Sequence, residues 1–79
     1  MNQLQQLLLQ RIDTAYFEFG ISIIPTDNCV SIKVDNKTII TVIPLKSMHR
    51  VNYSGGTRLT LDVAADVNEN LFDFFFVQP

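Results

Sequence analysis

The segment 30–43 constrains the fold of this chain more than any other stretch of its sequence. In the first half, apolar and polar side chains alternate strictly: Val30, Ile32 and Val34 fall on one side, and Ser31, Lys33 and Asp35 on the other. Four polar residues, 35–38, separate this run from a second β-branched run, 39–43. The pattern predicts a half-buried strand that turns into a hairpin.

The second strand of this hairpin is apolar on both faces. Ile40 and Val42 face one way, and Ile39 and Ile43 face the other way. Thr41 is then the only polar residue on the second face. A strand of this kind needs apolar cover on both sides. We expect an N-terminal helix on one side, and a second layer, a curled sheet or a partner on the other.

The beginning of the chain predicts one helix over residues 2–19. Gly20 follows where a helix C-terminus favours a residue with positive φ. Arg11 is the only base on the polar side, which argues against a helix that reads nucleic acid. The apolar residues recur at helical spacing, at Leu4, Leu8, Ile12, Ala15 and Phe19.

The remainder of the chain predicts short strands joined by turns. Gly55 and Gly56 mark the clearest turn, because paired glycines allow the positive φ values of tight hairpins. We expect one α+β domain over 1–79, with a single N-terminal helix packed on an antiparallel meander of five to six short strands. The last segment has an alternative as a short helix capped by Asp66 and Glu69. Strands are predicted at 21–24, 45–53, 58–63 and 71–77, with a polar connection at 64–70.

Composition limits the chemistry that the chain can perform. Cys29 is the only cysteine and His49 the only histidine, so an internal disulfide and a structural zinc site are excluded. One thiol and one imidazole, far apart in sequence, do not form a recognisable catalytic set. We therefore expect a protein that is not an enzyme and has no catalytic residues, no cofactor and no metal.

The distribution of apolar residues bears on location. The N-terminus has no basic region before its apolar residues, as a secretory signal would. No apolar run approaches the roughly 18 residues that a membrane-spanning helix needs. We expect a cytoplasmic protein that makes no membrane contact.

Charge is unevenly distributed, although the formal net charge is only −2. Residues 36–61 contain no acid, and residues 62–79 contain no base. The basic hairpin 46–58 leaves open a nucleic-acid-binding regulator that presents cations beside Tyr53. Charge complementarity with a protein partner predicts these binding residues: Lys46, His49, Arg50, Tyr53 and Arg58 in the basic part, and Asp66, Glu69 and Asp73 in the acidic part.

The chain has more apolar strand surface than one helix can cover. No stretch carries a motif that assigns a family. The leading hypothesis is a small non-catalytic protein-binding module, of the kind that phage and mobile elements use as stoichiometric inhibitors of host defence proteins. A homodimeric structural or accessory subunit is a further alternative. Self-association is predicted through Ile39, Ile43, Phe72, Phe74 and Phe76.

Overall fold

The computed structural model describes residues 2–77, which form an α+β fold. Residues 1, 78 and 79 of the predicted domain lie outside the described part of the chain. The elements follow in the order α1 (Gln3–Arg11), α2 (Thr14–Glu18), β1 (Ile21–Pro25), β2 (Val30–Val34), β3 (Lys37–Pro44), β4 (His49–Tyr53), β5 (Gly56–Thr60), α3 (Val63–Phe72) and the π-helical segment η1 (Asp73–Val77).

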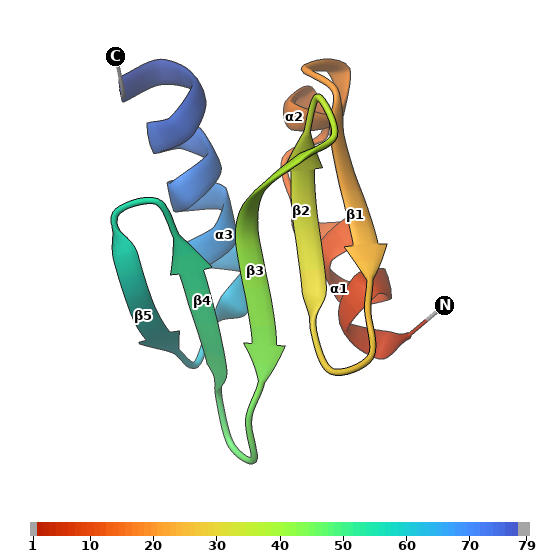
Figure 1. Ribbon diagram of the computed structural model, residues 1–79, viewed down its shortest axis with the longest axis vertical. Helices are drawn as coiled ribbons and strands as arrows, with labels where there is room; N and C mark the ends of the chain where they lie inside the picture. Colours follow the sequence, from red (N-terminus) through yellow and green to blue (C-terminus); the bar gives the residue numbers. More distant parts are fainter. Residues whose placement is uncertain (1, 78–79) are drawn as a thin grey trace.

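The five strands form one antiparallel sheet in the order β1-β2-β3-β4-β5, so each strand pairs with its neighbours in sequence. The predicted α+β class and the predicted meander of hairpins are confirmed. Figure 1 shows the helices behind one face of the sheet, with α1 and α2 behind β1 and β2, and α3 behind β3 and β4. We call this the covered face and the opposite one the open face.

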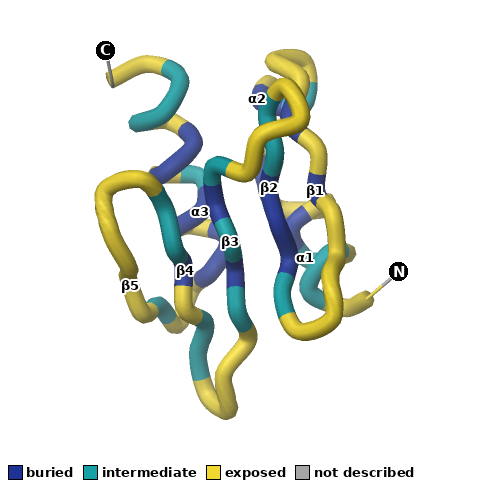
Figure 2. The backbone as a smooth tube through the Cα atoms, in the orientation of Figure 1, coloured by how far each residue is buried: buried dark blue, intermediate teal, exposed yellow. Residues whose placement is uncertain are grey.

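The core lies between the covered face and the helices. In the sheet, apolar side chains that alternate along neighbouring strands supply one half of it, and the helices supply the other half. Figure 2 shows this buried layer along the central strands and the inner side of the helices. Removing these branched side chains from water is the main favourable contribution to folding. The side chains with less than 2% exposure include Leu8, Ile32, Ile40, Val42, Val51, Val67 and Leu71.

The central hairpin turns on two residues rather than on four. Asp35 and Asn36 both have positive φ, 51° and 68°. These values are typical of a type I′ turn, whose twist matches that of the two strands. The turn pairs Val34 with Lys37, so Lys37 and Thr38, which were predicted as turn residues, already belong to β3.

A β-bulge changes the orientation of the second strand of this hairpin. Ile32 pairs with Ile40, but Lys33 pairs with Thr38, which leaves Ile39 as the extra residue of β3. Ile39 is half-buried and packs against the margin of the core. Other residues of the same chain therefore cover part of the Ile39 side chain. The sequence pattern predicted that a second layer or a partner would provide this cover.

The predicted N-terminal helix is confirmed, but its predicted extent over residues 2–19 is wrong, because the helix is broken after α1 and α2 follows as a separate helix. Ile12 has extended backbone angles and is buried, and Asp13 caps α2 by accepting a hydrogen bond from the Ala15 amide at 3.0 Å. Asn68 of α3 bridges the break. Its Oδ1 accepts from the Asp13 amide at 2.9 Å, and its Nδ2 donates to the Arg11 carbonyl at 3.0 Å. The break leaves backbone groups that would otherwise lack partners, and Asn68 satisfies two of them.

The predicted polar connection at 64–70 and the predicted strand at 71–77 are also wrong, because both lie in helical structure. Asp62 caps α3 by accepting from the Ala65 amide at 3.2 Å. Val63, Val67 and Leu71 recur every four residues and are all buried against the sheet. The alternative of a short helix is thus the correct one, with its cap at Asp62 rather than Asp66.

Two predicted strands are shorter than expected. Residues 45–48 form the turn between β3 and β4, in which the Leu45 amide donates to the Met48 carbonyl at 2.8 Å. The alternation within the predicted strand 45–53 breaks at Ser47 and Met48, which in the sequence suggests a bulge or an edge position, but the structure shows that the break marks this turn. At the other end, β5 ends at Thr60, so Leu61 lies outside the sheet and Val63 begins α3.

Candidate functional site

Four of the predicted partner-binding residues meet in one ionic network between β5 and α3. Arg58 pairs with Val51 of β4, and its side chain lies on the covered face. Its Nη1 donates to Asp66 Oδ1 at 2.8 Å and lies 3.5 Å from Glu69 Oε2. The guanidinium carbon also lies 5.7 Å from the centroid of the Tyr53 ring, within the range of a cation–π contact.

The acidic centre of this network is buried. Asp66 is 6% exposed, and Asn70 Nδ2 donates to its backbone carbonyl at 2.9 Å and lies 3.4 Å from its Oδ2. The hydrogen bond and the charge of Asp66 raise the pKa of the Arg58 guanidinium above its usual value, so Arg58 keeps its charge. The predicted basic and acidic patches therefore neutralise each other here.

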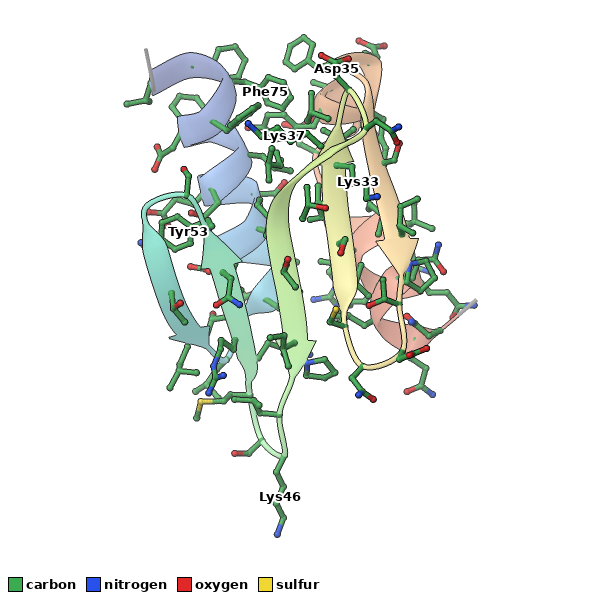
Figure 3. The ribbon with its side chains drawn as sticks, viewed as in Figure 1. Lys33, Asp35, Lys37, Lys46, Tyr53 and Phe75 are labelled. Atoms are coloured by element: carbon green, nitrogen blue, oxygen red, sulfur yellow. The ribbon has the colours of Figure 1, made fainter. Side chains whose placement is uncertain are left out.

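The structure brings the other predicted binding residues into no common site within residues 2–77. Lys46 is exposed in the turn between β3 and β4, and Figure 3 shows it extending beyond the end of the sheet. Arg50 is exposed on the open face, opposite Leu59. His49 is half-buried, and its Nδ1 has no hydrogen-bond partner among the described residues. Asp73 is half-buried at the start of η1.

Exposed aromatic side chains gather at one end of the helical layer. Phe19 is 45% exposed, Phe72 51%, Phe76 58% and Val77 62%. The Phe76 ring centroid lies 5.2 Å from that of Phe72 and 5.8 Å from that of Phe19, so the three rings are continuous. We call Phe19, Phe72, Phe76 and Val77 the aromatic surface.

Buried and half-buried rings hold the aromatic surface in place. Phe75 stacks on Tyr16 at a centroid distance of 5.8 Å and lies 5.1 Å from Phe19. Tyr16 is a core residue, and burial, together with the nearby charge of Asp13, raises the pKa of its phenol. The π-helical winding of η1 places successive aromatic residues on this end of the molecule, and such segments are frequent at functional sites.

The residues predicted for self-association divide among three places. Phe72 and Phe76 belong to the aromatic surface. Ile39 and Phe74 are half-buried and line a shallow groove of about 350 Å³, together with Lys37 and Tyr53 among others. Ile43 lies apart from them, half-buried in a different groove at the other end of the sheet.

That second groove, of about 690 Å³, lies between α1, the β1–β2 turn and the end of β3. It holds both residues that an enzymatic hypothesis requires, Cys29 and His49. The Cys29 sulfur lies 2.7 Å from Thr26 Oγ1, so it is engaged in the turn. Within residues 2–77 no three His, Cys, Asp or Glu side chains gather in a way that would hold a metal ion.

Sequence reasoning missed Phe19 and Val77 as members of the aromatic surface. Phe19 was assigned to the buried stripe of a continuous helix, and the helix break after α1 places it on the surface instead. Val77 was assigned to a strand. The run of aromatic residues after Leu71 was the available signal, but on its own it does not distinguish a strand from a helix.

Comparisons with protein-family models, with curated proteins and with solved structures find no match to this chain. Among the described residues, no helix has both the length and the apolar character that crossing a membrane requires.

Proposed function

We propose that this protein is a non-catalytic binding module that recognises another protein through the aromatic surface. The observation that supports the proposal is the exposure of three phenylalanine rings that the fold holds in fixed mutual contact. Full burial of such a side chain contributes roughly 1.5–3 kcal/mol. A partner that covers the rings gains this free energy, and it meets a surface that is already organised.

The charges around the aromatic surface define the chemistry of the partner. Residues 62–77 contain four acids and no base, and Glu18 directly precedes Phe19. Asp66 and Glu69 are offset by Arg58, whereas Asp73 and Glu18 take no part in that ionic network. We propose a partner segment that presents apolar side chains flanked by lysine or arginine.

Only the size and composition of the chain support the kind of binding module that we propose. A compact, acidic chain without catalytic residues suits a stoichiometric inhibitor, which acts by covering a surface of its target. We keep the inhibition of a host defence protein, by a phage or mobile-element product, as the specific form of the proposal.

The nucleic-acid alternative has less support. Phosphate contacts are made by available cations, and affinity falls as the number of such contacts decreases. Arg58 is engaged by Asp66 and Glu69, which leaves Lys46 and Arg50 as the exposed bases of the predicted basic hairpin. Retention on single-stranded oligonucleotides at about 50 mM salt, lost in Arg50→Ala, would favour this alternative over protein binding.

Affinity capture from lysate of a bacterial host tests the proposal with a pair of matched variants. The Phe72→Ser, Phe76→Ser variant removes two rings of the aromatic surface. The Ile24→Ser, Leu45→Ser variant removes two exposed apolar side chains elsewhere, which are 41% and 39% exposed. Circular dichroism first confirms that both variants fold.

We expect the wild type and the control to retain the same stoichiometric partner. The Phe72→Ser, Phe76→Ser variant should bind it at least about tenfold more weakly, because central aromatic residues usually dominate interface energies. Equal retention by the two variants, or no stoichiometric partner for the wild type, would contradict the proposal.

A further inference from the structure

The two edges of the sheet offer different numbers of free backbone groups. In an antiparallel sheet, residues of an edge strand alternate between bonding to the neighbour and pointing away from it. On β1, Ile23 and Pro25 point away from β2. Gln5 Nε2 donates to the Ile23 carbonyl at 3.2 Å, and Pro25 has no N–H to offer. This edge is therefore closed at two of its outward positions.

The β5 edge has no such cover. The two-residue turn at Ser54 and Gly55 makes Tyr53 and Gly56 a hydrogen-bonded pair. Counting along the ladder from this pair, Thr57 and Leu59 direct their N–H and C=O groups away from β4. In Figure 1, β5 is the outermost element on its side of the sheet, and neither a helix nor a strand of the described residues lies beyond it.

Exposed leucines accompany this edge. Leu59 is 57% exposed, and Leu61, just after β5, is 83% exposed, the highest value among the exposed large apolar residues. Edge strands usually carry a charge that prevents pairing with another strand. Arg58 is the only charge on β5, and its side chain is drawn toward α3 by Asp66.

We propose that β5 pairs antiparallel with β5 of a second copy of this chain, which joins the two sheets into one. In a symmetric pair each contact is made twice, so the register decides whether charges meet. A register centred on Arg58 sets two guanidinium groups directly opposite each other, which is unfavourable. The register centred on Leu59 places Leu59 opposite Leu59 of the second copy, and Arg58 opposite Thr60 of the second copy.

The Leu59-centred register uses the groups that are free. The outward N–H and C=O groups of Leu59 bond to those of Leu59 in the second copy, and Thr57 faces Leu61 of the second copy. Both exposed leucines are then covered. The paired strands and the aromatic surface share no residues. The proposed dimer can therefore be tested independently of the proposed function. One strand pair buries less than the roughly 1,200 Å² of a stable complex, so the dimer is weak.

Sedimentation equilibrium of the purified chain, up to about 1 mM, tests the pairing. We expect the wild-type mass to rise toward twice the monomer value as concentration increases. Leu59→Lys should remain monomeric, because it places two like charges opposite each other at the centre of the pair. Ile24→Lys is the matched control, since it adds the same charge to the open face at the β1 edge, and it should dimerise like the wild type.

Amide hydrogen exchange identifies the edge residues directly. In the monomer, the Thr57 and Leu59 amides lack ladder partners and exchange fast, whereas the Arg58 amide is protected. At high concentration the Thr57 and Leu59 amides should become protected at least about tenfold in the wild type and not in Leu59→Lys. A wild type that stays monomeric, or a dimer lost in the Phe72→Ser, Phe76→Ser variant but kept in Leu59→Lys, would overturn the proposal.

Discussion

The two faces of the sheet are built from the same strands but have opposite compositions. On the covered face, Ile32 pairs with Ile40 and Val42 pairs with Val51, and all four are buried. On the open face a row of small polar residues crosses four neighbouring strands, Ser31, Thr41, Asn52 and Thr57. Thr57 Oγ1 donates to Asn52 Oδ1 at 2.9 Å within this row.

The comparison shows where the apolar surplus of the chain lies. A polar row suits a sheet face without a second layer, and exposure along it rises from Ser31, which is 9% exposed, through the half-buried Thr41 and Asn52 to the exposed Thr57. The most exposed large apolar side chains lie instead at the end of the helical layer and along the β5 edge, whereas Leu9, Ile24 and Leu45, which are 39–41% exposed, lie elsewhere. Association is therefore expected at these margins rather than across the sheet.

The largest expected effect comes from a pair of alanine substitutions on neighbouring strands, one on each face of the sheet. Ile32→Ala should lower the free energy of unfolding by about 2–5 kcal/mol, because it leaves a cavity under the helices. Thr41→Ala on the open face should change it by less than about 0.5 kcal/mol. Urea denaturation followed by circular dichroism measures both. Similar losses in the two variants would show that the faces do not differ in their contribution to stability.

A second test concerns the buried carboxylate of Asp66, which lies on α3 and pairs with Arg58 of the covered face. Asp66→Ala should lower the free energy of unfolding, because Asn70 Nδ2 and Arg58 lose a buried partner. The loss should be smaller than in Ile32→Ala, since Arg58 still reaches water. Glu69→Ala, on the same helix but 62% exposed, is the control and should have little effect in the same urea experiment. Equal losses would mean that burial of Asp66 does not matter.

A third test concerns the Asp35–Asn36 turn. This turn sets the register between β2 and β3, and so decides which side chains of β3 lie on the covered face. Asn36 has a φ of 68°, a conformation that costs an alanine roughly 1 kcal/mol. Asn36→Ala should therefore lower the thermal midpoint, whereas Asn36→Gly should hold or raise it. A shift of register by one residue would exchange the two faces of β3, so the tight turn preserves the separation. If Asn36→Gly proves as destabilising as Asn36→Ala, backbone conformation is not the cause.

The smallest expected effect is a pH dependence at the helical side of the core. Burial raises the pKa of Tyr16 above 10.0, so its neutral phenol is favoured in the folded state. Its contribution to stability is full below pH 10 and is lost as the pH rises through the raised value. The Tyr16→Phe variant has no phenol to ionise, so it does not lose this part of the free energy of unfolding at high pH. Between about pH 8 and about pH 11, the free energy of unfolding of the wild type should therefore fall relative to that of Tyr16→Phe as the pH rises. A constant difference would contradict the assignment.

The sequence predicts the sheet better than the helices, for a physical reason. Strand alternation and hairpin turns are local, so Val30 to Val34 and a tight turn at Gly55 could be read directly, although the turn residues are Ser54 and Gly55 and Gly56 already belongs to β5. The helix break at Asp13 depends on Asn68, which lies far away in sequence. The continuous apolar stripe through Ile12 concealed it, although Asp13 followed by Thr14 is a capping signal.

The candidate site was predicted only in part, and for a related reason. Phe72 and Phe76 were selected for the correct property, their exposed apolar surface, but from a strand that does not exist. The assignment of 64–70 to a connection also hid the pairing of Arg58 with Asp66. Once these residues lie on a helix behind β5, their charges compensate each other rather than mark a binding patch.

The bridge made by Asn68 has a consequence for the order in which this polypeptide acquires its structure during synthesis. The corner between α1 and α2 obtains two of its backbone partners from α3, so it cannot be completed while α3 is still inside the ribosome. This corner therefore waits for a residue that is translated 55 positions after Asp13, and it is expected to become resistant to proteases only after α3 has emerged.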